Sequence, residues 1–182
     1  MSTTTPVKNG STNNNASPEK PVRIIKVASC KAMSGKSNLI YHLGAVGKDI
    51  YFRIFANDGG GFFSTEWIAL NDINAALSKA TKDKPITSYL LYRLFKGKSV
   101  NTPAFLLAAL RNEALVQPLK GKQRTHELMD PDGFLTKTNK LIASTVSLKP
   151  TDKPKMAPIK KRVATKTPIK KTPSKKTSPT RR

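Results

Sequence analysis

Four short stretches in the first half of the chain have the pattern of extended strands, and they lie at residues 22–27, 38–43, 50–55 and 62–69. The third stretch alternates between two faces and is rich in the aromatic and β-branched side chains that suit a pleated surface. The stretches 44–48 and 57–61 contain glycines and suit short connections between antiparallel neighbours. The pattern therefore predicts a four-stranded antiparallel sheet.

The hydrophobic period changes to that of a helix directly after the fourth stretch. Asn71 can cap this helix, whose apolar side would contain Ile73, Ala76, Leu77 and Ala80. Residues 86–95 fit strand and helix spacing equally well. The proline at 103 follows Asn101 and Thr102, which predicts a second helix over residues 103–115. We therefore expect an α+β fold, in which the sheet is followed by a helix and then by a further C-terminal helical element.

The distribution of large apolar side chains divides the chain into four segments. Residues 1–21 are mostly Ser, Thr, Asn and Pro, and we expect them to be disordered. Residues 22–118 hold nearly all the large apolar side chains, enough for a globular domain to close a core. We expect residues 119–152 to form a partly ordered linker. The Lys/Pro-rich residues 153–182 should form a disordered basic tail.

The formal net charge is +22, and both halves of the chain are basic. Residues 1–118 contain 15 Lys/Arg and 7 Asp/Glu, whereas residues 119–182 contain 18 Lys/Arg and 4 Asp/Glu. This excess predicts a polyanionic partner, with nucleic acid favoured over acidic lipid. The alternative is a charge excess that only keeps the protein soluble, although acidic residues serve that purpose better.

The tail at 153–182 contains 12 Lys/Arg and no acidic residue, and it repeats a Ser/Thr-Pro-x-Lys/Arg unit. It resembles the C-terminal tails of linker histones and histone-like bacterial proteins, which implies association with DNA. Proline keeps such a segment extended, and each cation can neutralise a phosphate. A targeting signal is the alternative. We expect sequence-independent binding, to DNA rather than RNA, through Lys160, Lys161, Arg162, Lys166, Lys170, Lys171, Lys175, Lys176, Arg181 and Arg182.

Alternation along the third predicted strand separates two kinds of side chain. One face carries Ile50, Phe52 and Ile54, which should pack against the helix. The other carries Tyr51, Arg53 and Phe55, and we place Tyr41 beside them on the neighbouring strand. An arginine between two aromatic residues is typical of a platform on which bases stack. The same residues also fit a dimer interface or a second core layer, and the sequence leaves these alternatives open.

The order of the predicted elements also suggests a family. Four antiparallel strands lead into a helix through Trp-Ile-Ala-Leu-Asn at residues 67–71. This arrangement, over about residues 23–80, is similar to the positive-cofactor-four coactivators, Pur-alpha and Whirly proteins. The resemblance implies a sheet that binds single-stranded nucleic acid, usually within a dimer. A homodimer is therefore an expected assembly.

Few residues suit catalysis or metal binding. Cys30 is the only cysteine, and His42 and His126 are the only histidines, so an internal disulfide and a multi-cysteine zinc site are excluded. The Gly-Lys-Ser triplets at 35–37 and 97–99 lack the first glycine of a phosphate-binding loop. We expect no enzymatic activity, no cofactor and no metal.

The remaining patterns concern DNA reading, membranes and location. A helix-turn-helix would place its second helix at residues 103–115, but that stretch is too rich in Phe, Leu and Ala to read bases, so core packing is favoured. No apolar run approaches the length that spans a bilayer. We expect an intracellular protein without a membrane partner, in the cytoplasm and nucleoid of a bacterium or the nucleus of a eukaryote. The alternative function is a protein-interaction adaptor that docks a partner while its tail holds DNA or RNA.

Overall fold

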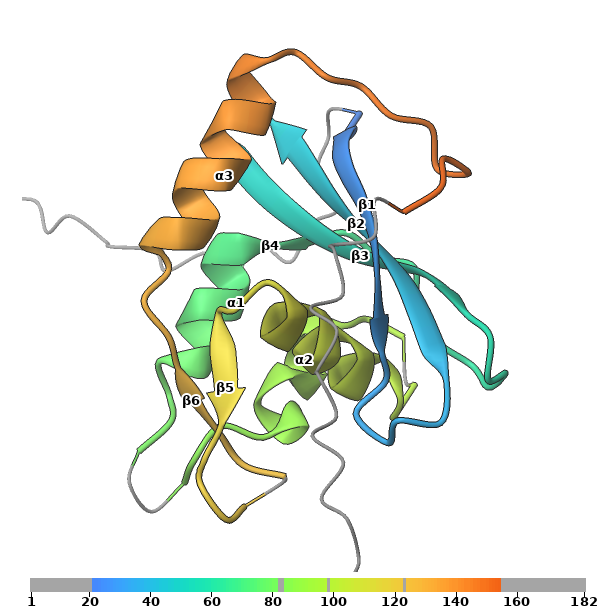
Figure 1. Cartoon of the computed structure of the whole chain (residues 1–182). Coiled ribbons are helices and arrows are strands. Elements are labelled where there is room, and N and C mark those ends of the chain that lie inside the picture. Colours follow the sequence, from blue (N-terminus) through green and yellow to red (C-terminus); the bar gives the residue numbers. More distant parts are fainter. Residues whose placement is uncertain (1–20, 82–83, 98, 123, 155–182) are drawn as a thin grey trace, which may run out of the picture.

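The computed structural model describes residues 21–81, 84–97, 99–122 and 124–154. Its first four strands form one antiparallel sheet in chain order (Figure 1). They are β1 (Arg23–Lys31), β2 (Asn38–Val46), β3 (Asp49–Asn57) and β4 (Ile68–Ala69). The predicted fold class, an α+β domain with a four-stranded antiparallel sheet followed by helices, is confirmed. The expected disorder of the N-terminal segment and of the tail concerns residues that lie almost wholly outside the described ranges.

Helices and a small hairpin follow the sheet. The helices are α1 (Leu70–Leu77), the 3-10 helix η1 (Ser88–Leu94), α2 (Thr102–Asn112) and α3 (Asp132–Ala143). The hairpin between α2 and α3 pairs β5 (Val116–Pro118) with β6 (His126–Leu128). Asn71 is not the helix cap that its position suggests, because α1 begins one residue earlier and lacks a side-chain cap. None of the helices in the described part of the chain is long and apolar enough to cross a membrane.

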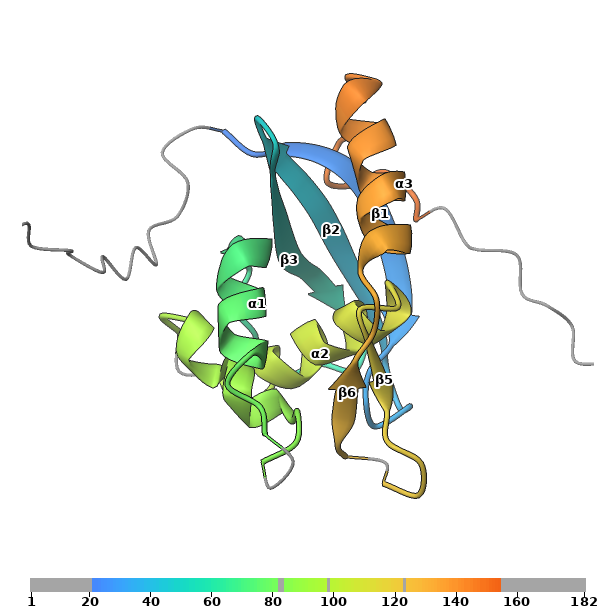
Figure 2. The same cartoon turned by 90° about the vertical axis from the view of Figure 1, so that its left-hand side faces the viewer.

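The helices lie together on one face of the sheet, which we call the inner face (Figure 2). The side chains of Ile50, Phe52 and Ile54 are buried on this face, as alternation along the third strand predicts. α1 and α2 contribute leucine, isoleucine and alanine side chains to the same cluster. Removing these apolar surfaces from water is the main source of stability for such a layer.

The core extends past residue 118, where we expected the globular domain to end. Phe134, on α3, belongs to the buried cluster, and its ring stacks on Phe52 with 5.9 Å between the ring centroids. The guanidinium of Arg23 donates hydrogen bonds to the carbonyl of Ile142 (3.0 Å) in the last turn of α3 and to that of Val146 (2.6 Å) just after the helix. Residues 119–152 are therefore part of the folded unit and not a linker attached to it.

The fourth strand is much shorter than the one predicted over residues 62–69. Only the last two residues of that stretch, Ile68 and Ala69, pair with β3. The preceding loop is attached instead to the segment that leads into α2. The Glu66 carboxylate accepts hydrogen bonds from the backbone N–H groups of Lys96 (3.0 Å) and Gly97 (3.1 Å). These bonds attach the stretch before β4 to the segment that leads into α2. The predicted strand is therefore reduced to its last two residues.

Candidate nucleic-acid interface

The face of the sheet opposite the helices, which we call the outer face, gathers side chains from β2, β3 and the residue before β4. His42 and Arg53 are cross-strand partners, so their side chains lie on the same face. The pairing register shifts beside Phe55, which leaves this residue without a partner directly opposite. Such a bulge can re-aim a side chain. The Phe55 ring stacks on the His42 ring with 4.5 Å between centroids.

Arg53 is held between two aromatic rings on the outer face. Its Cζ lies 4.6 Å from the centroid of Trp67 and 5.5 Å from that of Phe55. One terminal nitrogen of the guanidinium lies 3.0 Å from His42 Nδ1, and because arginine is only a donor, the histidine nitrogen accepts. Cation–π contacts of this kind are worth about 0.5–2 kcal/mol each, depending on desolvation. Arg53 is therefore a packed member of the face as well as a cation.

His42 is enclosed within this cluster, with 0% of its surface exposed. Burial and the neighbouring Arg53 guanidinium lower the pKa of His42 to about 4, against a weaker opposite effect of the Pro150 backbone. The ring is therefore neutral at pH 7. Its Nε2 atom has no hydrogen-bond partner among the described residues. A buried neutral ring is suited to packing and not to the transfer of protons with a substrate.

The chain after α3 covers part of the outer face. The backbone N–H of Leu148 donates to the carbonyl of Ile24 (2.9 Å), which attaches this segment to the edge of β1. Figure 1 shows the segment passing from the end of α3 to the side of β1. Ile24 and Val27, which point to the outer face from β1, are buried. The outer face is thus a second, smaller packed layer near β1 and β2, and it is half open at β3.

Three of the four predicted platform residues share the outer face. Tyr51, Arg53 and Phe55 are each partly exposed there. Tyr51 lies opposite Gly44 on β2 and Ala69 on β4. Whether these three residues contact bases stays a prediction. The sequence left open whether these side chains form a second packed layer or an exposed surface. In the structure they pack against one another and also retain exposed surface.

Tyr41 does not belong to this group, and its placement beside Tyr51 was wrong. It is the cross-strand partner of Ile54, so the register turns its side chain to the inner face, where it is fully buried. Its hydroxyl donates to a carboxylate oxygen of Glu113 and accepts a hydrogen bond from Asn112 Nδ2 (2.7 Å). Burial, followed by the nearby carboxylate, raises the pKa of Tyr41. The phenol thus keeps its proton and satisfies a polar position inside the core.

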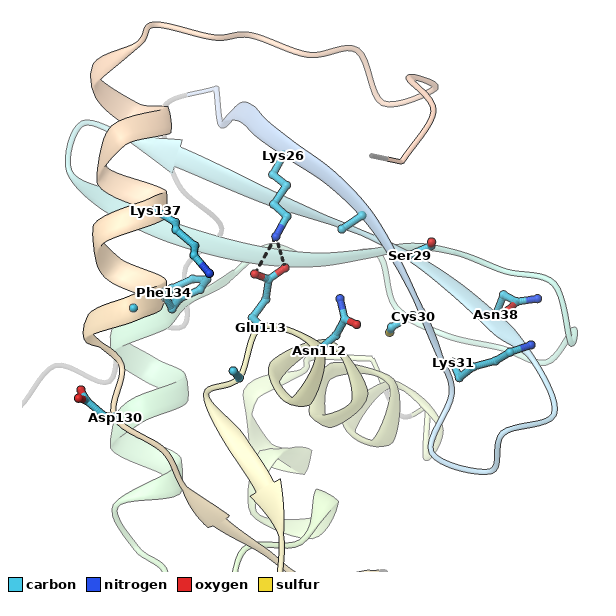
Figure 3. Close-up of a pocket in the computed structure, with 13 residues that line it drawn as sticks. Lys26, Ser29, Cys30, Lys31, Asn38, Asn112, Glu113, Asp130, Phe134 and Lys137 are labelled. Carbon is cyan, nitrogen blue, oxygen red and sulfur yellow. Dashed lines mark hydrogen bonds and ion pairs between the residues drawn. The ribbon is translucent and has the colours of Figure 1, made fainter. Parts of the chain in front are cut away.

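A groove of about 710 Å³ runs between β1, the end of α2 and the start of α3 (Figure 3). Lys26 faces Glu113 there, with its Nζ 2.6 and 2.7 Å from the two carboxylate oxygens. Lys31 and Lys137 also line the groove. Burial raises the pKa of Cys30, another lining residue, to about 11, so this thiol stays protonated and is a poor nucleophile at neutral pH. The groove therefore combines apolar surface with three lysines and two acidic residues, and the Lys26–Glu113 contact within it is a structural ion pair.

The ten basic tail residues predicted to bind phosphate lie between positions 160 and 182, outside the described residues. Their role therefore stays a prediction. Among the described residues, no three His, Cys, Asp or Glu side chains are grouped so that they could hold a metal ion. The triplet Gly-Lys-Ser at 35–37 lies in the turn between β1 and β2.

Sequence reasoning missed the most exposed aromatic side chains. Phe62 is 92% exposed in the loop before β4, and Tyr89 and Tyr92 on η1 are 80% and 39% exposed. The loop around Phe62 is anchored, since the carbonyl of this residue accepts hydrogen bonds from the side chains of Ser99 (2.6 Å) and Asn101 (3.3 Å). The stretch 86–95 does contain a signal for a 3-10 helix. Its aromatic residues recur every three positions, at Tyr89, Tyr92 and Phe95.

Comparison with protein families, with curated proteins and with solved structures finds no match for this chain. The fold and the two surfaces described above define an α+β domain with a basic surface excess. The features of this domain that bear on its function are its charge and its exposed side chains.

Proposed function

We propose that this protein binds nucleic acid, with DNA favoured over RNA, and that it catalyses no reaction. The distribution of charge carries the proposal. The chain has a net charge of +22, and its described residues alone contain 18 Lys/Arg against 9 Asp/Glu. The folded part is therefore basic in its own right, as well as the tail. A polyanion is the partner that such a surface attracts from a distance and binds with release of counterions.

The two parts of the chain would contribute in different ways. The Lys/Pro-rich tail supplies affinity without sequence specificity, because its cations neutralise phosphates wherever the backbone passes. The folded part positions the nucleic acid or selects single strands. The half-open side of the outer face supports this role, since it presents aromatic surface of Tyr51 and Phe55 beside the cation of Arg53. A homodimer is part of the same proposal.

A binding titration across a salt series tests this function. The full chain should bind duplex DNA, single-stranded DNA and single-stranded RNA, and the logarithm of affinity should fall linearly with the logarithm of salt concentration. A polyglutamate of similar charge is the control, because it offers anionic groups without phosphates or bases. Affinity that does not change with salt, or equal affinity for polyglutamate and every nucleic acid, would contradict the proposal.

The alternative, a protein-interaction adaptor, is favoured by the groove beside β1. Among the described strands, β1 pairs only with β2, and beyond Ile24, whose carbonyl accepts a hydrogen bond from Leu148, its other edge borders the groove and can accept an extended segment of a partner protein. Lys31 and Lys137 would suit acidic side chains on that segment. The substitution Gly133→Trp tests this, because a Cβ at this lining position meets open space and a larger side chain fills the groove. If Gly133→Trp weakens nucleic-acid binding, the groove contacts the nucleic acid. It would then not be the docking site of a protein partner.

A further inference from the structure

η1 carries a row of exposed tyrosines that the packing of the domain does not use. A 3-10 helix has three residues per turn, so residues i and i+3 lie directly above one another, about 6 Å apart along the axis. In η1 this period separates two rows. Leu91 and Leu94 are buried in the core, whereas Tyr89 and Tyr92 are exposed. The two tyrosines therefore form one row on the solvent side of the helix, which we call the tyrosine row.

The leucines, and not the tyrosines, hold η1 in place. Leu91 is fully buried and packs with side chains of the core cluster. The Tyr89 ring is 80% exposed, so it contributes little buried area to folding. A single exposed aromatic residue is ordinary in a folded protein. Two exposed tyrosines three residues apart on one 3-10 helix lie on the same side of it, so they offer a partner two planar rings in one direction.

Two cations lie close to the tyrosine row in sequence, and one acidic residue, Glu66, lies beside the second of them. Arg93 follows Tyr92 on η1, and Lys96 lies two residues beyond the end of the helix with an exposed side chain. The residues of η1 include no Asp or Glu. Cations beside aromatic rings match a ligand that combines phosphates with planar bases. A duplex keeps its bases paired and stacked on each other, so only a single strand can offer them to these rings.

We propose that Tyr89 and Tyr92 stack on unpaired bases of a single-stranded nucleic acid, while Lys96 and Arg93 lie beside its phosphates. This inference rests on the proposed nucleic-acid binding and assigns it a second surface, on η1 and apart from the sheet. Stacking on an aromatic ring tolerates any base, so the tyrosine row selects for single strands and not for sequence.

The test compares the full chain with its Tyr89→Ala/Tyr92→Ala variant. The probes are oligothymidylate, oligouridylate and an abasic DNA strand of equal length. Each lost stacking contact should weaken binding to a strand with bases by about five- to 150-fold, equivalent to 1–3 kcal/mol per base. The abasic strand should bind both proteins equally, because it has phosphates but no bases. The slope of log affinity against log salt should not change, since no cation is removed.

Two matched variants accompany the measurement. Tyr89→Phe/Tyr92→Phe keeps the rings and should keep the affinity, which separates stacking from any use of the hydroxyls. Leu128→Ala removes an apolar side chain that is 54% exposed on β6 and should leave binding unchanged. The phenylalanine and Leu128→Ala variants should melt at the wild-type temperature, while the double alanine variant should melt slightly lower and stay folded, because Tyr92 is 39% exposed and loses some packing. The oligothymidylate and oligouridylate arms separate DNA from RNA as the ligand.

Several outcomes would overturn the inference. If the wild type binds single strands and the double alanine variant binds them equally well, the tyrosine row is not a stacking surface, although the proposed function stands. Equal losses on abasic and normal strands would show that the rings act without bases. Lost self-association with unchanged affinity for single strands would make the row a protein interface. If the wild type binds no nucleic acid, the proposed function itself fails.

Discussion

Arg53 is the residue around which the outer face is organised. Its guanidinium contacts the Trp67 and Phe55 rings and a nitrogen of His42. Its Nε atom is buried and has no hydrogen-bond partner among the described residues. A cation held in this way is partly desolvated, which strengthens the ring contacts and costs hydration. The consequence is that removing a ring from the cluster should affect stability as well as binding.

Phe55→Ala and Tyr51→Ala form a matched pair that measures this difference. Phe55 stacks on His42 and contacts Arg53, so its removal should lower the free energy of unfolding by about 2 kcal/mol. Tyr51 stacks on no aromatic ring among the described residues and lies at the half-open side, so its removal should cost less than about 1 kcal/mol. Denaturant unfolding of both variants gives the comparison. Equal, small losses would indicate that the outer face is open along its whole length.

The buried His42 predicts how stability depends on pH. Its pKa is lowered from 6.5 to about 4 in the folded protein, so the unfolded chain binds more protons between these two values. Stability is therefore fully present above pH 6.5 and decreases as the pH falls toward 4. We expect a loss on the order of 2 kcal/mol, allowing for solvent screening of the charges.

Thermal melts at pH 7 and pH 4.5 check this expectation, with His42→Phe as the control. Phenylalanine keeps a ring beside Phe55 but cannot be protonated, so its melting temperature should fall less on acidification. His126, whose pKa is also lowered by burial, is present in both proteins and contributes equally. A variant with the same pH dependence as the wild type would exclude His42 as the source.

The sequence alone predicts the buried side of some residues and not of others. Alternation alone identifies the buried face of β3, because Ile50, Phe52 and Ile54 are uniformly apolar. It does not assign Tyr41, whose ring is apolar and whose hydroxyl is polar. Its face is decided by the pairing register with β3 and by two distant hydrogen-bond partners at the end of α2. A change of register by one residue would reverse the assignment.

At the scale of elements, the strongest departure from the sequence pattern is α3. Half of its twelve residues are polar, so its sequence gives only a weak signal for joining a core. Phe134 is its buried side chain in the core cluster, with Leu135, Leu141 and Ile142 packed against that cluster, and Arg23 donates one hydrogen bond to the last turn of α3 and one to the chain after it. The shortness of β4 and the 3-10 geometry of η1 also differ from what local sequence predicts. In both, long-range contacts override the local periodicity.

Phe134→Ala tests whether α3 is part of the core. The ring is buried against Phe52, so its removal leaves a cavity and should lower the free energy of unfolding by about 3–4 kcal/mol. Leu128→Ala, on the exposed side of the preceding hairpin, should change it by less than about 0.5 kcal/mol. Chemical denaturation of the full chain measures both. A loss for Phe134→Ala as small as that of the control would return 119–152 to the role of a linker.

At the scale of the whole molecule, charge and fold are separable. The core clusters lie within the described residues 21–154, while residues 155–182 contain 11 Lys/Arg and no acidic residue. Residues 149–154 belong to the described part of the chain and make contacts of their own. Pro154 is half-buried, and the Lys149 backbone N–H donates to the Asp152 carboxylate (2.8 Å). Folding and electrostatic binding can therefore be measured independently.

The most direct test of nucleic-acid binding is the salt dependence of duplex DNA affinity for the full chain and for a chain ending at residue 154. Each phosphate contact contributes about −0.9 to the slope of log affinity against log salt. Removing the tail should therefore flatten the slope by several units and weaken binding strongly at low salt, while the melting temperature stays the same. An unchanged slope with an intact fold would contradict the account, because the tail would then neutralise no phosphates.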